Sequence, residues 1–288
     1  MLFNSWIFLL FLLVTFALFY GVSRWSRAGT LQIGILIGAS FVFYAFETPA
    51  LLLLLLLSTL VNAMAAALLL RRETGRGAVL FLAVVFNLGT LAVFKYLGLF
   101  VGTFVAEAAE GHSSWWMEIP LPVGISFYTF QGLSLVIDLY RDRSDERFAA
   151  IRQLLVRGDY LSYYSRIAFF ISFFPQLVAG PIVKASTFLP QIEFKRPGGI
   201  QWDLVVKNLI LGFFLKMVVA DNLKEVTVLM HYPNFQRLPQ GDLFLLVFGY
   251  SFQIFADFAG YSLIAIGLGR LFGYRFPVNF NFPYISTS

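Results

Sequence analysis

The chain has 288 residues, of which 59% are hydrophobic, 18% aromatic and only 13% charged. A water-soluble domain needs more polar surface than this, whereas a helical membrane protein does not, so we predict an integral membrane protein. The net charge of +5 could suit a nucleic-acid partner. However, the basic residues fall in short clusters between apolar runs, as cytoplasmic loops do, and we expect no nucleic-acid binding. The absence of cysteine excludes disulfides and cysteine metal ligands.

Five apolar runs follow one another in the first half of the chain. They cover residues 3–20, 31–46, 50–70, 78–105 and 123–140. Each is predicted to be a membrane-spanning helix, and the first lacks the basic start and cleavage site of a secretory signal. The loops between them are alternately basic and acidic or neutral, which places the N-terminus outside and the arginine-rich loops in the cytoplasm.

The alternation fails near residues 160–200. Pro175 and the sequence Gly180-Pro181 interrupt any continuous helix there. A full crossing would also export Lys184 and Lys195 against the positive-inside rule. We therefore predict a re-entrant hairpin that returns to the cytoplasmic side and lines a cavity, because irregular backbone at membrane depth is tolerated only there or inside protein. A kinked full span with these lysines outside is the alternative.

The last apolar run, residues 243–272, carries a polar stripe. Gln253, Asp257 and Tyr261 are four residues apart and therefore stack on one helical face. A charged aspartate at the bilayer centre costs about 2.5–3.5 kcal/mol, so Asp257 should face protein or a wet cavity. It is either a structural residue bonded to a neighbouring helix or a functional group.

Another predicted span, residues 204–220, precedes this run. Lys207 and Lys216 lie towards its ends, where long side chains can reach the interface. On the last run, small residues form a face that another helix could approach closely. These small residues are Ala265, Gly269 and Gly273.

The predicted fold is an all-α polytopic membrane protein with about seven transmembrane helices and one re-entrant hairpin. We expect one membrane domain, 1–288, with four spans in 1–106 and a core segment in 119–288. No internal repeat is evident in the sequence.

The inventory of catalytic residues is short. The two histidines, His112 and His231, lie in loops without a second ligand at metal-binding spacing, so we predict no metal site. The sequence has no glycine-rich phosphate loop, no zinc-protease motif and no nucleophile elbow. From the residues alone, the chain shows a polar-lined cavity in the membrane without a complete catalytic set.

Three sequence blocks carry a resemblance to a known family. They are LPVGISFYTFQGLSLVIDLY at 121–140, FFPQLVAGPIV at 173–183 and FQIFADFAGYSLIAIGLGRLFGYRFPVNFNFPY at 252–284. In this order they resemble the membrane-bound O-acyltransferase (MBOAT) family, in particular its alginate O-acetyltransferase branch. The resemblance covers about residues 91–288, and the first ninety residues are similar to the branch only in hydropathy.

The resemblance implies a ring of helices, here partial, around a funnel with a catalytic histidine at its base. In the alginate branch that histidine follows shortly after an Asn-Phe-Asn-x-Pro-Tyr motif, which here begins at Asn279 and is followed by the end of the sequence at Ser288. Neither His112 nor His231 has a matching context. The 288-residue chain alone is therefore expected to be inactive, as a piece of a longer enzyme or half of a split one.

The resemblance also implies roles for residues that are present. Asp257 would support the absent histidine by orienting it or balancing its charge. Residues expected to line the funnel or contact an anionic donor are Gln253, Tyr261, Pro175, Gln176, Gly180, Pro181, Lys184 and Arg275.

The implied reaction moves an acyl group, most simply acetyl, across a bacterial inner membrane. The donor would be acetyl-CoA or an acyl-carrier thioester, with no tightly bound cofactor. The acceptor would be an extracytoplasmic polysaccharide such as alginate or cellulose, reached through a periplasmic acetyltransferase and the polysaccharide machinery, with membrane lipid around the chain. The alternatives are a D-alanyl or lipid acyltransferase, or a non-catalytic transporter or scaffold. A transporter should show paired broken helices in two repeats, and one broken element is found.

Overall fold

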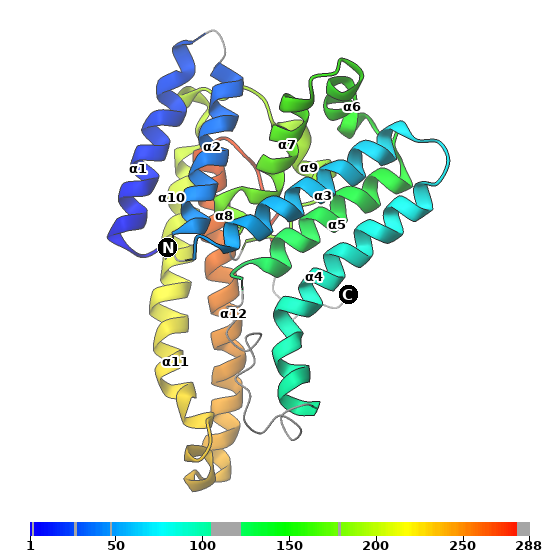
Figure 1. The fold of residues 1–288 in the computed structure, drawn as a ribbon. Helices are drawn as coiled ribbons and strands as arrows, with labels where there is room; N and C mark the ends of the chain where they lie inside the picture. Colours follow the sequence, from blue (N-terminus) through cyan, green and yellow to red (C-terminus); the bar gives the residue numbers. More distant parts are fainter. Residues whose placement is uncertain (2, 26–27, 47, 105–121, 178–179, 281–288) are drawn as a thin grey trace.

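The computed structural model describes residues 1, 3–25, 28–46, 48–104, 122–177 and 180–280 (Figure 1). Every regular element within these residues is helical, which confirms the all-α prediction. The predicted spans correspond to helices whose ends differ by a few residues. These helices are α1 (Trp6–Gly21), α2 (Ala28–Ala45), α3 (Leu51–Arg71), α4 (Arg76–Phe104), α5 (Ile125–Arg141), α10 (Trp202–Phe213) and α12 (Gln240–Leu271).

Four helices in the described residues are long and apolar enough to cross a membrane. They are Trp6–Arg24, Leu51–Arg71, Arg76–Tyr96 and Gln240–Leu271. Gly29–Ala45 is a shorter apolar helix, α5 has 17 residues, and α10 changes helix type partway along its course. The chain is an integral membrane protein, and its predicted seven spans comprise four long helices and three shorter or interrupted ones.

The helices form two groups that meet at α2, α7 (Tyr160–Ser172) and α8 (Phe174–Leu177). In Figure 1, α3, α4 and α5 run side by side as one tilted layer. The other group is a long hairpin, in which α10 and α11 (Asp221–Thr227) run antiparallel to α12 and extend beyond the other described helices. With 32 residues, α12 is about 48 Å long and exceeds a hydrocarbon core of about 30 Å.

The segment predicted to be re-entrant doubles back on itself. After α7 and α8 the chain returns through α9 (Ala185–Phe188) and η4 (Leu189–Gln191), which contacts α7. Arg166 donates from Nη1 to the Ile192 carbonyl oxygen at 2.8 Å, and the Phe169 and Phe188 rings lie 5.3 Å apart. The helix breaks just before Pro175, as the missing N–H requires. The two arms therefore lie side by side, and the depth of the hairpin in the bilayer stays a prediction.

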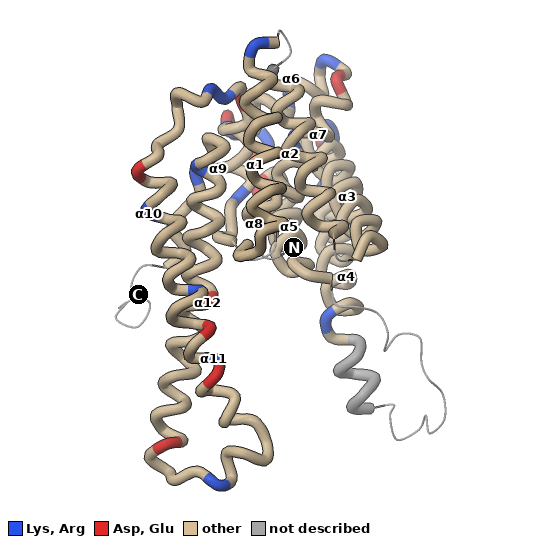
Figure 2. The backbone as a smooth tube through the Cα atoms, turned by 90° about the vertical axis from the view of Figure 1, so that its left-hand side faces the viewer, with Lys and Arg blue, Asp and Glu red and all other residues tan. Residues whose placement is uncertain are grey.

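The basic loops gather at one end of the molecule, where α6 (Ala149–Val156) lies (Figure 2). Arg76 donates from Nη2 to the carbonyl oxygens of Leu139 and Tyr140 at 2.8 and 2.9 Å, which joins two of these loops. Gln32 on α2 exchanges hydrogen bonds with the backbone of Lys195. The return arm thus ends beside the start of α2.

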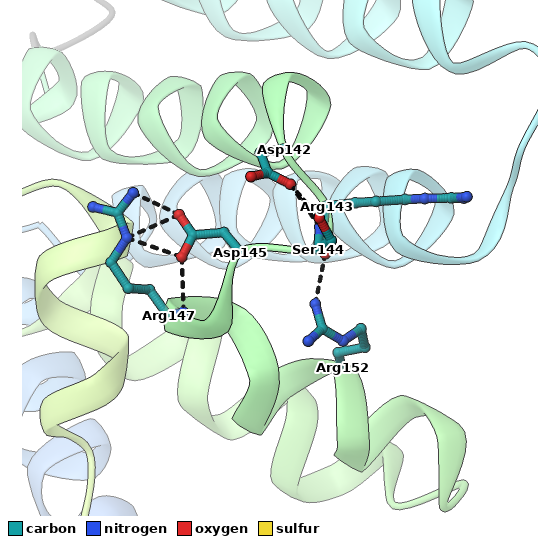
Figure 3. Close-up of polar contacts among 6 residues, drawn as sticks. All are labelled: Asp142, Arg143, Ser144, Asp145, Arg147 and Arg152. Carbon is teal, nitrogen blue, oxygen red and sulfur yellow. Dashed lines mark hydrogen bonds and ion pairs between the residues drawn. The ribbon is translucent and has the colours of Figure 1, made fainter.

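The loop after α5 is a network of charged turns at this end (Figure 3). Asp142 accepts hydrogen bonds from the N–H and hydroxyl of Ser144, and Asp145 accepts from the N–H and guanidinium of Arg147. These bonds lower the pKa of both carboxyls. Arg152 donates to the Arg143 carbonyl oxygen at 2.7 Å and ties the loop to α6.

Candidate functional site

Asp257, near the middle of α12, forms an ion pair with a lysine of the opposing helix. Its Oδ1 lies 2.7 Å from the Nζ of Lys216, which also donates to Oδ1 of Asp221 at 2.7 Å. The prediction that Lys216 reaches outward to the interface is wrong, because its ammonium group is held between two carboxylates. One ammonium group thus pairs with two carboxylates. We call these three residues, Lys216, Asp221 and Asp257, the charged triad.

The triad depends on a local change of helix type. Between α10 and α11 the backbone forms a π-helix, η6 (Phe214–Ala220). A π-helix has i→i+5 hydrogen bonds, so it stacks residues five apart, whereas an α-helix turns them about 140° away from each other. Lys216 and Asp221 are five apart. Hydropathy carries no signal for this change, which is why the sequence did not identify Lys216 as the partner of Asp257.

Glycines bring α10 and α12 close enough for the ion pair. A Cβ at Gly260 would lie 2.9 Å from both the Gly212 carbonyl oxygen and the Lys216 nitrogen. A Cβ at Gly212 would lie 2.8 Å from the nitrogen of Ile264. Any side chain at these two positions would push the helices apart, because real Cβ atoms do not approach this closely.

The predicted small-residue face is used differently from the expectation. The three atoms nearest to a Cβ built on Gly269 all belong to the Phe276 ring, the closest at 2.7 Å, and Gly273 follows the helix with a φ of +80°. Ala265 does face a neighbour, since its Cβ lies 3.4 Å from a Cβ built on Gly180. The close helix contact predicted for this face instead uses Gly260 and Gly267, which pack against α10.

The other two residues of the polar stripe face the same neighbouring helix unit. The Thr227 hydroxyl on α11 donates to Oε1 of Gln253. The Nζ of Lys216 lies 5.2 Å from the centre of the Tyr261 ring, a cation–π distance. The side chains of Asp221 and Asp257 are 42% and 43% exposed, so the triad is open on one side. The predicted stripe thus contacts the unit formed by η6 and α11 along its length, and the carboxylate of Asp257 within it is partly accessible.

The re-entrant block packs on α12 further along the same helix. Pro175, Gln176, Gly180 and Pro181 are buried. Nε2 of Gln176 donates to the Phe170 carbonyl oxygen at 2.8 Å, and its buried Oε1 has no hydrogen-bond partner among the described residues. Because Gly180 packs at Ala265, the block lies eight residues, or about 12 Å, along α12 from Asp257.

Lys184 and Arg275, predicted to contact an anionic donor, are both exposed. The Lys184 carbonyl oxygen accepts from the N–H groups of Thr187 and Phe188 in the turn that follows it. Gln191 clamps the backbone of Arg275, accepting from its N–H at 2.7 Å and donating to its carbonyl oxygen at 3.0 Å. A donor contact by these side chains stays a prediction.

The chain that leaves α12 runs back along it. Asn279 donates to the Ser262 hydroxyl at 3.4 Å, and the Phe280 ring lies 5.7 and 5.8 Å from those of Phe255 and Phe258. The start of the Asn-Phe-Asn-x-Pro-Tyr motif is therefore held beside the helical turn that carries Asp257. Sequence reasoning missed this approach, since the two stretches are separated by the end of the helix. The rest of the motif, residues 281–288, lies outside the described residues.

Of the two histidines, the structure describes His231 alone. His112 lies outside the described residues, and His231 is exposed in the loop between α11 and α12. No group of three or more histidine, aspartate or glutamate side chains in the described part of the chain could hold a metal ion.

The apolar helices with a charged triad between them define a polytopic membrane protein with an internal polar site. Comparison with known proteins gives its relatives. The chain is 34% identical over 301 residues to "Probable alginate O-acetylase AlgI" of Pseudomonas aeruginosa, covering 100% of the chain and 52% of that protein. It is 30% identical over 305 residues to the peptidoglycan O-acetyltransferase of Helicobacter pylori, covering 99% and 56%. The teichoic acid D-alanyltransferase of Bacillus subtilis is 28% identical over 58% of the chain and 39% of its own length.

The chain is thus similar over its whole length to members of the membrane-bound O-acyltransferase family. No family model matches it. The similarity extends over the whole chain, so the expectation that the first ninety residues are alike only in hydropathy is wrong. The chain spans about half the length of the curated relatives that it matches.

Proposed function

We propose that this chain is part of a membrane O-acyltransferase that transfers an acetyl-sized group to an extracytoplasmic polysaccharide. Its relatives named for alginate and peptidoglycan acetylation support O-acetyl transfer over nearly the whole chain. The D-alanyltransferase relative supports the rival transfer over 58% of the chain. We further propose an inner-membrane location with the N-terminus outside and the basic loops in the cytoplasm, in accordance with the positive-inside rule.

The observation that carries the proposal is the open carboxylate of Asp257 beside the returning segment at Asn279 and Phe280. A carboxylate that stays ionised can accept the second N–H of a catalytic imidazole, fix its tautomer and stabilise its charged form. In this proposal, the ion pair with Lys216 positions the carboxylate of Asp257, and the family's histidine, which the resemblance implies beyond this sequence, is the group that it serves.

The remaining site residues take supporting roles in the proposal. Gln253, Tyr261 and the re-entrant block line the acyl passage, with Gln176 Oε1 as an unused acceptor beside it. Lys184 and Arg275 meet the phosphates or acidic surface of acetyl-CoA or an acyl-carrier protein at the basic end. A periplasmic acetyltransferase and the polysaccharide machinery would receive the group on the other side.

The test is to express the complete reading frame that contains this chain in cells lacking their own polysaccharide O-acetylation. Ester-linked acetate on the exported polymer is the expected product. Ester-linked D-alanine would instead establish the rival transfer. Neither ester, with the protein present in the membrane, would overturn the acyltransferase proposal.

A further inference from the structure

A small polar cavity opens at the basic end of the molecule, away from α12. It has a volume of about 200 Å³ and lies between the start of α2, the first turns of α7 and the return arm of the hairpin. Its polar lining consists of Thr30, Ser162, Ser165, Arg166 and Glu193. Nothing in the proposed acyl transfer uses this cavity.

Arg166 supplies a positive charge to the cavity that no carboxylate neutralises. One of its five N–H donors goes to the Ile192 carbonyl oxygen. Among the described residues, no acid lies within ion-pair distance of it. Glu193 is the single acid of the lining, and its carboxylate is 3.4 Å from the Nζ of Lys195 and 73% exposed. The guanidinium is half-buried and therefore available to an anion that enters from outside.

Hydroxyl groups complement this charge. Thr30 contributes a hydroxyl from α2, whereas the Ser162 hydroxyl bonds the Asp159 carboxylate at the start of α7 and Ser165 donates to the Leu161 carbonyl oxygen of its own helix. A guanidinium with a neighbouring hydroxyl is a donor set that suits a tetrahedral phosphate, since Arg binds phosphate oxygens in a fork.

The surface beside the cavity is apolar. Val156 and Leu161, at the corner between α6 and α7, are 83% and 79% exposed, and Tyr160 next to them stacks under Arg71 at 5.2 Å. An interface of this kind, with aromatic and aliphatic side chains next to arginines, is typical of a membrane surface with anionic lipid. A phospholipid with its phosphate in the cavity would have its acyl chains beside the exposed Leu161 side chain.

We propose that this cavity binds the phosphate group of an anionic phospholipid through Arg166 and Thr30, with Ser162 in its wall. The lipid would sit between α2, α7 and the return arm, where it would fasten the re-entrant hairpin to the first helices. The proposal is independent of the acyl-transfer chemistry.

Native mass spectrometry of the purified 288-residue chain in mixed micelles tests this. We expect at least tenfold more retained phosphatidylglycerol than phosphatidylcholine. Arg166→Gln and Ser162→Leu should each abolish the preference, the first by removing the charge and the second by filling the cavity while leaving the Arg166–Ile192 bond intact. Arg157→Gln, which removes an exposed arginine outside the cavity, is the matched control and should change retention less than twofold.

Each other outcome would overturn the proposal. Equal retention of the two lipids would exclude a specific site, and an equal loss in Arg157→Gln would indicate diffuse surface charge. Inorganic phosphate is the second arm: if millimolar phosphate binds and removes the lipid signal, the site serves a soluble phosphate and not a lipid. If Arg166→Gln unfolds, as a thermal melt would show, Ser162→Leu decides the question alone.

Discussion

Two polar clusters lie between the apolar helices, and they are built on opposite principles. In the first, Asn62 on α3 and Asn87 on α4 exchange amide hydrogen bonds of 3.1 and 2.9 Å. Their remaining N–H donors go to the carbonyl oxygens of Ser58 and Ala83, and both side chains are buried. This pair carries no charge, is buried, and has a hydrogen-bond partner for every amide N–H.

The charged triad is the second cluster. One ammonium is shared by two carboxylates, about two-fifths of each acid is exposed, and a π-helix is needed to align Lys216 with Asp221. A neutral amide pair suffices to fasten membrane helices, because interhelical hydrogen bonds stabilise them without the cost of burying charge. The contrast teaches that a polar contact between membrane helices does not by itself identify a functional site. A contact with exposed charged groups and unequal numbers of acids and bases does.

The largest expected effect is the loss of acyl transfer in the 288-residue chain taken alone. If Asp257 serves a histidine beyond this sequence, the 288-residue chain alone should give no acyl transfer in an acetyl-release assay with membranes. The amide pair, by contrast, should be complete in the same preparation, with normal thermal stability. Measurable turnover by the chain alone would contradict the role given to the missing histidine.

Substituting Asp257→Asn in the complete protein should lower acyl transfer at least tenfold at normal membrane levels. The amide keeps the shape of the side chain but loses the charge that an imidazole requires. The double variant Lys216→Met with Asp257→Leu separates the two roles. It should restore any lost thermal stability, because apolar side chains can replace an ion pair between packed helices. It should not restore activity. Recovery of activity would assign Asp257 to the scaffold.

Much of this could be predicted from the sequence, for identifiable reasons. Apolar length located the helices, spacing by four found the stripe of Gln253, Asp257 and Tyr261, and Pro175 with the charge rule indicated the hairpin. The partner of Asp257 could not be found, since a π-helix leaves the hydropathy of η6 (Phe214–Ala220) unchanged. Asn62 was overlooked within a run of leucine and alanine because a single amide hardly alters an apolar segment.

Close packing of α10 on α12 offers the next test. Gly260→Ala should push Lys216 away from Asp257, because the new Cβ would meet two backbone atoms at 2.9 Å. We expect a lower melting temperature and several-fold less activity. Gly249→Ala on the same helix is the matched control, since its Cβ would meet only Thr227 at 3.8 Å, an ordinary contact. Equal effects of the two variants would show that helix propensity, and not the approach of α10, is responsible.

Breaking the amide pair should affect stability and spare chemistry. Asn87→Leu leaves the buried amide of Asn62 without its partner, at a cost of about 1–2 kcal/mol. Activity per folded molecule should be unchanged, as measured by acetyl release normalised to the folded fraction in a thermal melt. A tenfold loss of specific activity would erase the distinction drawn between the two clusters.

The smallest effect is expected where charges pair in water, in the loop after α5 (Figure 3). Ser144 and Arg147 lower the pKa of Asp142 and Asp145, respectively, below the ordinary value of 3.8. A carboxyl with a lowered pKa in the folded state contributes stability above its unfolded pKa and loses it as the pH falls through the folded one. The loop should therefore be unchanged from pH 7 down to about 4 and loosen below that.

Carboxyl-carbon NMR shifts would measure both midpoints. Ser144→Ala should move the Asp142 midpoint back towards 3.8 and leave that of Asp145 in place. Neither Ser144→Ala nor Arg147→Ala should alter membrane level or melting temperature measurably, because exposed ion pairs contribute little to stability. The Arg147–Asp145 pair is at least as short as the Lys216–Asp257 pair, at 2.5 against 2.7 Å, so distance cannot explain a difference between them. If Arg147→Ala and Asp257→Asn had the same effect, the surroundings of the triad would carry no significance, and its interpretation as a site would fail.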